Sequence, residues 1–124
     1  MNLLVDTNIF IDYLRSDKTV AKIFLDEKTT IYYSILTKKE LIQRRGLSVS
    51  EKKAIDGLLR SFRPIRIDPQ IAQAASLMQE TYKKQKLDAH DAIIAATAWV
   101  KKMPLATRNV KHFRFIKEIR INTF

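Results

Sequence analysis

Carboxylate side chains recur in this sequence where short apolar segments end. Asp6 follows the apolar run at 3–5. Glu40 comes a few residues after a second segment of strand-like composition, and Asp88 and Asp91 open a long apolar helical segment. In a parallel sheet the carboxyl ends of the strands share one edge, where open α/β folds place their ligand sites. We therefore expect the acidic residues to gather in one crevice.

Such a group of acids has a specific chemistry. Asp and Glu are ionised at neutral pH, with reference pKa values of about 4. When several lie a few ångströms apart they repel, so they must be protonated, separated or bridged by a cation. Mg2+ or Mn2+ is the natural bridge, because these hard ions prefer oxygen ligands. Metals held in this way support the hydrolysis of phosphodiesters, which is the reaction that the acidic residues predict.

Each of these residues also has a purely structural interpretation. Asp6 could be a turn residue or a helix N-cap, and Glu40 could complete a capping box with Thr37. Asp88 and Asp91 could merely complement a helix dipole. The metal site becomes the better hypothesis when the acids are taken together with the charge of the chain.

The chain is strongly basic. It has 23 Lys and Arg against 13 Asp and Glu, a formal net charge of +10, and a pI near 10.0. A basic surface attracts polyanions, of which nucleic acid is the commonest in a cell, although an acidic protein or a membrane surface would satisfy the same field. The charge therefore favours a nucleic-acid partner.

The composition excludes several other classes of protein. The sequence has no cysteine, which removes disulfides and thiolate chemistry and fits a reducing cytoplasm. We expect no signal peptide, because Asp6 interrupts the N-terminal apolar run. We expect no membrane span, because the apolar stretch at 92–100 is far shorter than the roughly 20 residues required. The two glycines cannot build a glycine-rich phosphate loop.

Apolar periodicity predicts alternating strands and helices. The predicted strands lie at 3–5, 30–35, 64–67, 104–107 and 119–124. The predicted helices lie at about 8–15, 20–27, 37–46, 50–62, 68–86 and 88–102, with a turn or short helix at 109–113. Thr37, Ser50 and Asp68 are the expected N-caps. We predict that residues 1–124 form one α/β domain, a mostly parallel central sheet flanked by helices on both faces.

Four segments of the chain, in order, resemble a PIN domain, and more closely the VapC-type toxins of bacterial and archaeal toxin–antitoxin pairs. These segments are LLVDTNIFIDYL, SILTKKEL, DAIIAATA and PLATRNVKHF. The resemblance covers nearly the whole chain. It implies a single PIN-like domain and a cytoplasmic, Mg2+- or Mn2+-dependent endoribonuclease.

The resemblance also implies roles for individual residues. The residues with expected catalytic roles are Asp6, Glu40, Asp91 and Asn109, the first three as metal ligands. Asn109 stands where the family often has Asp and contributes no charge, so the site could hold one metal or two. The residues expected to orient carboxylates or water are Thr7, Asn8, Thr107 and, ranked below them, Asp88. Those expected to contact RNA phosphates are Lys38, Lys39 and Arg108.

Two histidines and two aromatic residues near these segments are assigned structural roles. His90 is expected to point to a different face from Asp91, and His112 to be a structural or surface residue. Trp99 and Phe113 are expected to be core aromatics rather than platforms for base stacking. We therefore predict no histidine in the site.

The implied partners are a cognate antitoxin protein that inhibits the enzyme, an RNA substrate and a second copy of the chain in a homodimer. Two other functions stay open. One is a catalytically weak or inactive PIN-like module that binds RNA or a partner, and Asn109 is the feature that favours it. The other is a DNA-directed PIN-like nuclease, although such chains are generally longer.

Overall fold

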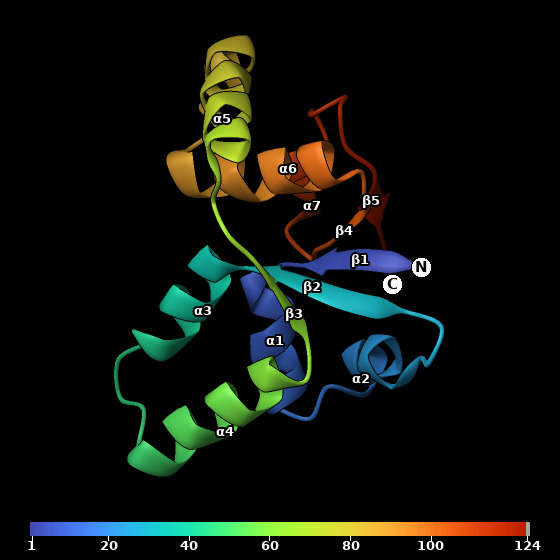
Figure 1. Cartoon of the computed structure of the whole chain (residues 1–124), viewed down its shortest axis with the longest axis vertical. Coiled ribbons are helices and arrows are strands. Elements are labelled where there is room, and N and C mark those ends of the chain that lie inside the picture. The colour runs from blue at the N-terminus through green and yellow to red at the C-terminus, as the bar shows by residue number, and fades with distance from the viewer. Residues whose placement is uncertain (124) are drawn as a thin grey trace.

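In the computed structural model, which describes residues 1–123, a five-stranded parallel sheet forms the middle layer (Figure 1). The strands are β1 (Asn2–Val5), β2 (Thr30–Ser34), β3 (Arg63–Ile65), β4 (Leu105–Ala106) and β5 (Ile121–Asn122). Their order is β3-β2-β1-β4-β5, and every neighbouring pair is parallel. The carboxyl ends of β1, β2 and β4 therefore meet at one edge, as the sequence predicts.

Helices cover both faces of the sheet, which confirms the predicted layers. The helices are α1 (Thr7–Leu14), α2 (Lys18–Leu25), α3 (Ile35–Ile42), α4 (Val49–Arg60), α5 (Pro69–Thr81), α6 (Ala89–Lys101) and α7 (Val110–Phe113), with a 3-10 turn, η1 (Lys83–Gln85). Figure 1 shows α5 and α6 on one side of the sheet and α1, α2 and α4 on the other. No helix within residues 1–123 has both the length and the apolar composition needed to cross a membrane.

The central strand β1 divides the core into two parts. Leu4 packs with α5 and α6 in one cluster of buried residues. Leu3 and Val5 pack on the opposite face with Ile9 and Phe10 of α1. Because side chains alternate across a strand, a three-residue apolar run serves both faces of the sheet. Burial on both faces holds the end of β1 firmly, and Asp6 follows at that end.

Helix α6 is central because its side chains are small. Ala92, Ala95 and Ala96 are fully buried, and α6 packs along α5. Small side chains let two helices approach closely without leaving a void. Asp88 caps the helix by accepting a hydrogen bond from the backbone nitrogen of Asp91 at 2.8 Å. The packing of α6 therefore fixes the position of its first turn.

An aromatic cluster anchors α1 on the other face. The ring of Phe10 lies 5.4 Å from Phe24, 5.9 Å from Tyr33 and 6.1 Å from Phe62, between ring centroids. Phe24 in turn stacks on Tyr13 at 4.2 Å. These contacts join α1 to α2, β2 and the end of α4. They hold the helix whose first turn follows Asp6.

Two predicted helix starts are wrong. Helix α3 begins at Ile35 and is capped by Ser34, whose hydroxyl accepts from the backbone nitrogen of Leu36 at 3.2 Å. The predicted capping box of Thr37 and Glu40 is therefore absent from α3. Both residues lie inside the helix, which frees the Glu40 carboxylate for other contacts.

Helix α4 begins at Val49, not after a cap at Ser50. Ser48 and Glu51 form a reciprocal capping box, with the backbone nitrogen of Glu51 donating to the Ser48 hydroxyl at 3.1 Å. The S-x-x-E pattern is present in the sequence and begins at Ser48, two residues before the predicted cap at Ser50. Asp68 caps α5 as predicted.

Several element ends also differ from the prediction. Helix α3 ends at Ile42 rather than Gly46, and Gly46 occupies a turn with a φ of +80° that favours glycine. Helix α5 ends at Thr81, and Lys86 takes a left-handed conformation after the 3-10 turn. Strand β5 spans only Ile121–Asn122, and position 124 of the predicted last strand lies outside the described residues.

We expect replacement of Phe10 by Ala to destabilise the fold by about 3–5 kcal/mol, because it empties a fully buried site among three aromatic rings. Urea unfolding followed by circular dichroism measures this loss. Leu25→Ala is the matched control, since Leu25 is 73% exposed, and it should change the free energy of unfolding by no more than about 0.5 kcal/mol. Equal losses in the two variants would contradict the central position of Phe10.

Candidate functional site

Asp6 marks the junction of β1 and α1 and is almost entirely buried, with 4% of its surface exposed. One carboxylate oxygen accepts a hydrogen bond from the backbone nitrogen of Thr7 at 2.8 Å. The other accepts from the Thr107 hydroxyl at 2.9 Å, across the sheet from the end of β4. Asp6 is thus an N-cap as well as a candidate ligand. A carboxylate accepts about four hydrogen bonds, so each oxygen keeps an acceptor site.

Burial dominates the electrostatics of Asp6. It raises the pKa of the carboxyl group above its ordinary value, while the hydrogen bonds from Thr107 and Thr7 offset part of that effect. Asp91 raises the pKa further and His90 lowers it. A buried carboxylate with this balance is stabilised by any nearby cation.

Glu40 projects from α3 toward α1. Its Oε1 accepts a hydrogen bond from the Thr7 hydroxyl at 2.7 Å. The Thr7 hydroxyl also lies 3.1 Å from the hydroxyl of Thr37, and both threonines are buried. These contacts orient Glu40, so its expected proximity to the end of β1 is confirmed even though the expected capping box is not.

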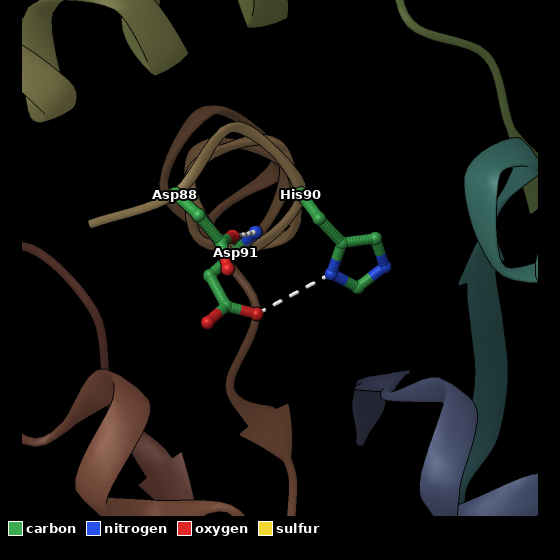
Figure 2. A group of neighbouring side chains, drawn as sticks. All are labelled: Asp88, His90 and Asp91. Atoms are coloured by element: carbon green, nitrogen blue, oxygen red, sulfur yellow. Dashed lines mark hydrogen bonds and ion pairs between the residues drawn. The ribbon is translucent and has the colours of Figure 1, made fainter. Parts of the chain in front are cut away.

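His90 and Asp91 extend from the first turn of α6 into the same space (Figure 2). His90 Nε2 lies 2.5 Å from Glu40 Oε1, and His90 Nδ1 lies 3.3 Å from Asp91 Oδ1. His112 Nδ1 lies 2.9 Å from Asp91 Oδ2. The expectation that His90 points away from the face of Asp91 is therefore wrong, and both histidines contact the predicted site.

The histidines and carboxylates shift each other's protonation. The hydrogen bond to Asp91 raises the pKa of His90 to about 9, with Glu40 adding to the shift and burial opposing it. For Asp91, burial pushes the pKa up, but the bonds with His90 and His112 more than compensate and the pKa falls below its ordinary value. At neutral pH in the absence of metal, His90 is an imidazolium between two carboxylates.

These side chains line a single cavity of about 490 Å³, which we call the acidic cavity. Its lining residues are Asp6, Thr7, Asn8, Ile11, Glu40, Arg44, Asp88, His90, Asp91, Asn109 and His112. The structure thus brings together all four residues with expected catalytic roles. Thr107 lies behind them, where its hydroxyl accepts from the Asn109 backbone nitrogen at 3.0 Å and donates to Asp6.

The three residues expected to contact phosphate do not line the acidic cavity as residues 1–123 form it. Lys38 and Lys39 lie on α3, next to Glu40 in the chain but outside the cavity lining. Arg108 forms ion pairs with Asp12 at 3.1 Å and Asp17 at 2.7 Å. These pairs tie the segment after β4 to α1 and to the cap of α2.

Sequence reasoning missed His90, His112 and Arg44 as cavity residues. Helical periodicity places consecutive residues about 100° apart, which suggested that His90 and Asp91 face different ways. The cavity lies at the N-terminal end of α6, however, and there two side chains of the first turn can point into the same space. The position of His90 directly before a candidate ligand at a helix start was the signal available.

The donor set fits a hard divalent cation. Asp6, Glu40 and Asp91 supply only oxygen ligands, as Mg2+ and Mn2+ prefer. A second grouping consists of Asp88, His90 and Asp91 (Figure 2), whose ligand atoms all lie within 4.8 Å of one another. Its imidazole would favour softer ions. Asp91 belongs to both sets, so it is the residue on which either arrangement depends.

Comparison with known proteins gives consistent matches along the whole chain. The family model described as PIN domain matches residues 3–118. Ribonuclease VapC1 of Methanocaldococcus jannaschii is 32% identical over 125 residues, 98% of this chain and 86% of that protein.

Two solved structures share the fold closely. VapBC-1 from nontypeable Haemophilus influenzae is 27% identical, covers 99% of this chain and 98% of its own, and gives a TM-score of 0.85. A toxin–antitoxin complex from Klebsiella pneumoniae is 28% identical, covers 94% of both chains and gives a TM-score of 0.76.

We expect the His90 imidazole of the EDTA-treated protein to titrate near pH 9 rather than at its ordinary 6.5. Because the pKa is raised on folding, the stabilisation is complete below pH 6.5 and is lost as the pH rises through about 9. The free energy of unfolding should therefore fall across this window. NMR of the ring protons and unfolding at each pH measure the two effects.

Asp91→Asn is the matched variant for this titration, because it weakens the largest cause of the shift while leaving Glu40 in place. It should move the His90 midpoint back toward 6.5. A wild-type midpoint already at 6.5 would refute the bridging role of His90.

Proposed function

This chain belongs to the PIN domain family and to its VapC-type members, and from that premise we propose that it is a metal-dependent endoribonuclease toxin. The observation that carries the proposal is the convergence of Asp6, Glu40, Asp91 and Asn109 on one cavity at the carboxyl edge of the sheet. The net charge of +10 supports a polyanionic substrate.

The metal in this proposal is Mg2+ or Mn2+, held by Asp6, Glu40 and Asp91. When bound, such an ion supplies Lewis acidity that activates water and offsets charge on a phosphate. Thr7 orients Glu40 and Thr107 orients Asp6, since each donates a hydrogen bond to that carboxylate. These hydroxyls keep the oxygens of two ligands in fixed directions.

The neutral Asn109 and the charged His90 adjust the charge of the cavity. Asn109 contributes an amide where a further carboxylate would add repulsion. His90 holds a proton between Glu40 and Asp91 while no metal is present. Entry of a cation therefore requires His90 to give up that position or its proton. Lys38 and Lys39 do not line the cavity, so the geometry adds no support to their predicted contacts with phosphate.

We further propose that a cognate antitoxin protein inhibits the enzyme in the cytoplasm. The Klebsiella pneumoniae relative is described as a toxin–antitoxin complex, which supports a partner of this kind. A cationic side chain of the antitoxin would pair with Asp6, Glu40 or Asp91 and compete with the metal. The excess of carboxylates in the acidic cavity suits such a contact.

We expect the purified protein to cut total cellular RNA into discrete fragments with Mg2+ or Mn2+, and EDTA to abolish the cleavage. Asp6→Asn should lower the rate at least about 100-fold, because it removes a buried charged ligand. Gel analysis and fragment sequencing measure both effects. Asp56→Asn is the matched control, since Asp56 pairs with Arg60 on α4 away from the cavity and should leave the rate unchanged.

The alternatives give different results in the same experiment. RNA binding that ignores EDTA, without cleavage, would favour the inactive binding module. Cleavage of single-stranded or flap DNA in preference to RNA would favour the DNA-directed nuclease. Cleavage that survives Asp6→Asn would contradict the proposed site itself.

We also propose a homodimer, with α5 and α6 as its interface. Leu77 of α5 is 56% exposed and lines a surface hollow with Trp99 and Val100 of α6. Light scattering should give twice the chain mass of 14.4 kDa, and Leu77→Lys should return it to one chain. Leu25→Lys, on the exposed end of α2, should leave the dimer intact; a single-chain mass for the wild type would disprove the proposal.

A further inference from the structure

A second hollow lies beside the acidic cavity, along α1 and α4, and we call it the α1–α4 groove. Its volume is about 350 Å³. The residues that line it are Ile11, Leu14, Arg15, Arg44, Leu47, Glu51, Ala54 and Ile55. Ile11 and Arg44 also line the acidic cavity. The groove and the cavity therefore adjoin, and Arg44 stands where they meet.

Arg44 is the cation of this junction. It is half-buried in the turn between α3 and α4, and it is the one Lys or Arg that lines the acidic cavity within residues 1–123. No ion pair or side-chain hydrogen bond joins it to the described residues. Its charge adds to the hydrogen bonds from Ser48 that lower the pKa of Glu51. Its guanidinium is available to an incoming anion.

Glu51 repels an anion bound at Arg44 only weakly. Its Oε1 accepts a hydrogen bond from the Ser48 backbone nitrogen at 3.1 Å, as part of the capping box of α4. The carboxylate is thereby directed to the start of its own helix. Arg15 and Arg44 together leave the groove with a net positive charge, two cations against one acid.

A polynucleotide that reaches the acidic cavity lies close to both negative carboxylates and the positive Arg44. Carboxylates repel its phosphates wherever no metal compensates them, so an adjoining phosphate is stabilised best by a fixed cation beside the cavity. A planar guanidinium matches the geometry of phosphate oxygens and donates two hydrogen bonds at once. Arg44 is the described residue that meets both requirements.

The rest of the α1–α4 groove suits the nucleotide attached to that phosphate. Leu14 and Leu47, which are partly exposed, offer an apolar wall on which the face of a base loses contact with water. A base is free to use such a wall only when it is unstacked, as in single-stranded RNA. Arg15, at the C-cap of α1, provides a second cation along the same path.

We propose that Arg44 binds the phosphate next to the scissile one, and that the α1–α4 groove accepts the adjoining nucleotide of single-stranded RNA. The proposal rests on the ribonuclease function proposed above. It assigns a substrate contact to Arg44 in place of the neighbouring lysines of α3.

The test is RNA binding by variants in an Asp6→Asn background, in which cleavage is expected to be at least about 100-fold slower. The anisotropy of a short fluorescent single-stranded RNA is followed over a range of NaCl concentrations. Arg44→Ala should raise Kd roughly three- to tenfold and reduce the slope of log Kd against log salt by about 0.7, the value for one phosphate contact to a single strand. Arg44→Lys should restore most of that slope, because it keeps the charge.

Arg45→Ala is the matched control. Arg45 is the next residue of the same turn, is exposed and lines neither the acidic cavity nor the groove. Arg45→Ala removes the same unit of charge as Arg44→Ala. Because Arg45 lines neither site, the salt slope of this variant should equal that of the parent protein. With the active enzyme, Arg44→Ala should raise KM more than it lowers kcat, and thermal unfolding should match that of Arg45→Ala.

The outcomes separate the two proposals. If the wild type cleaves RNA but Arg44→Ala and Arg45→Ala give the same Kd and salt slope, the assignment of Arg44 is wrong and the ribonuclease function stands. If the wild type neither binds nor cleaves any RNA, both proposals are wrong. A lower salt slope for Arg44→Ala alone, with Arg44→Lys restoring it, supports Arg44 as a phosphate contact at the mouth of the groove.

Discussion

The concentration of carboxylates at the end of β1 is the constraint around which this molecule is organised. Asp6, Glu40 and Asp91 line one cavity, and such groups repel each other strongly when water is excluded. Each acid is held by specific donors: Thr7 and Thr107 for Asp6, the Thr7 hydroxyl for Glu40, and His90 and His112 for Asp91. These bonds make an otherwise unstable cluster compatible with a folded chain.

Several site residues also perform an ordinary structural task. Asp6 caps α1, and Asp88 caps α6. The structural and functional interpretations of these acids are therefore compatible, because a carboxylate that accepts one backbone hydrogen bond retains oxygen lone pairs that can bind a cation. The same arrangement places the positive ends of two helices near the acids, which further reduces their repulsion.

The positive charge that attracts a polyanion and the negative charge of the candidate site lie in different parts of the molecule. The chain as a whole carries a formal net charge of +10, yet the acidic cavity is lined by four carboxylates. A basic surface draws a polyanion from a distance, while the acidic cavity admits a phosphate only together with a cation. The Arg108 ion pairs with Asp12 and Asp17 show that part of the positive charge instead fixes the loop after β4.

The sequence by itself determined the layers, the parallel sheet and the meeting of Asp6, Glu40 and Asp91, because period-two and helical apolar patterns fix which segments are buried and parallel strands share one carboxyl edge. It determined the cap at Asp68 as well. The elements and the cap depend on local patterns within single segments, and the meeting of the acids follows from the shared carboxyl edge of parallel strands.

Only the tertiary structure decided where the long side chains go. His90 turns toward Glu40, a residue 50 positions away, and Arg108 turns toward Asp12 and Asp17 rather than toward the cavity. The start of α3 at Ile35 likewise placed Glu40 within the helix instead of in its cap. A flexible side chain near a helix end has several partners within reach. Which one it contacts depends on charged groups that are distant in the sequence and come close only on folding, so residue spacing does not predict it.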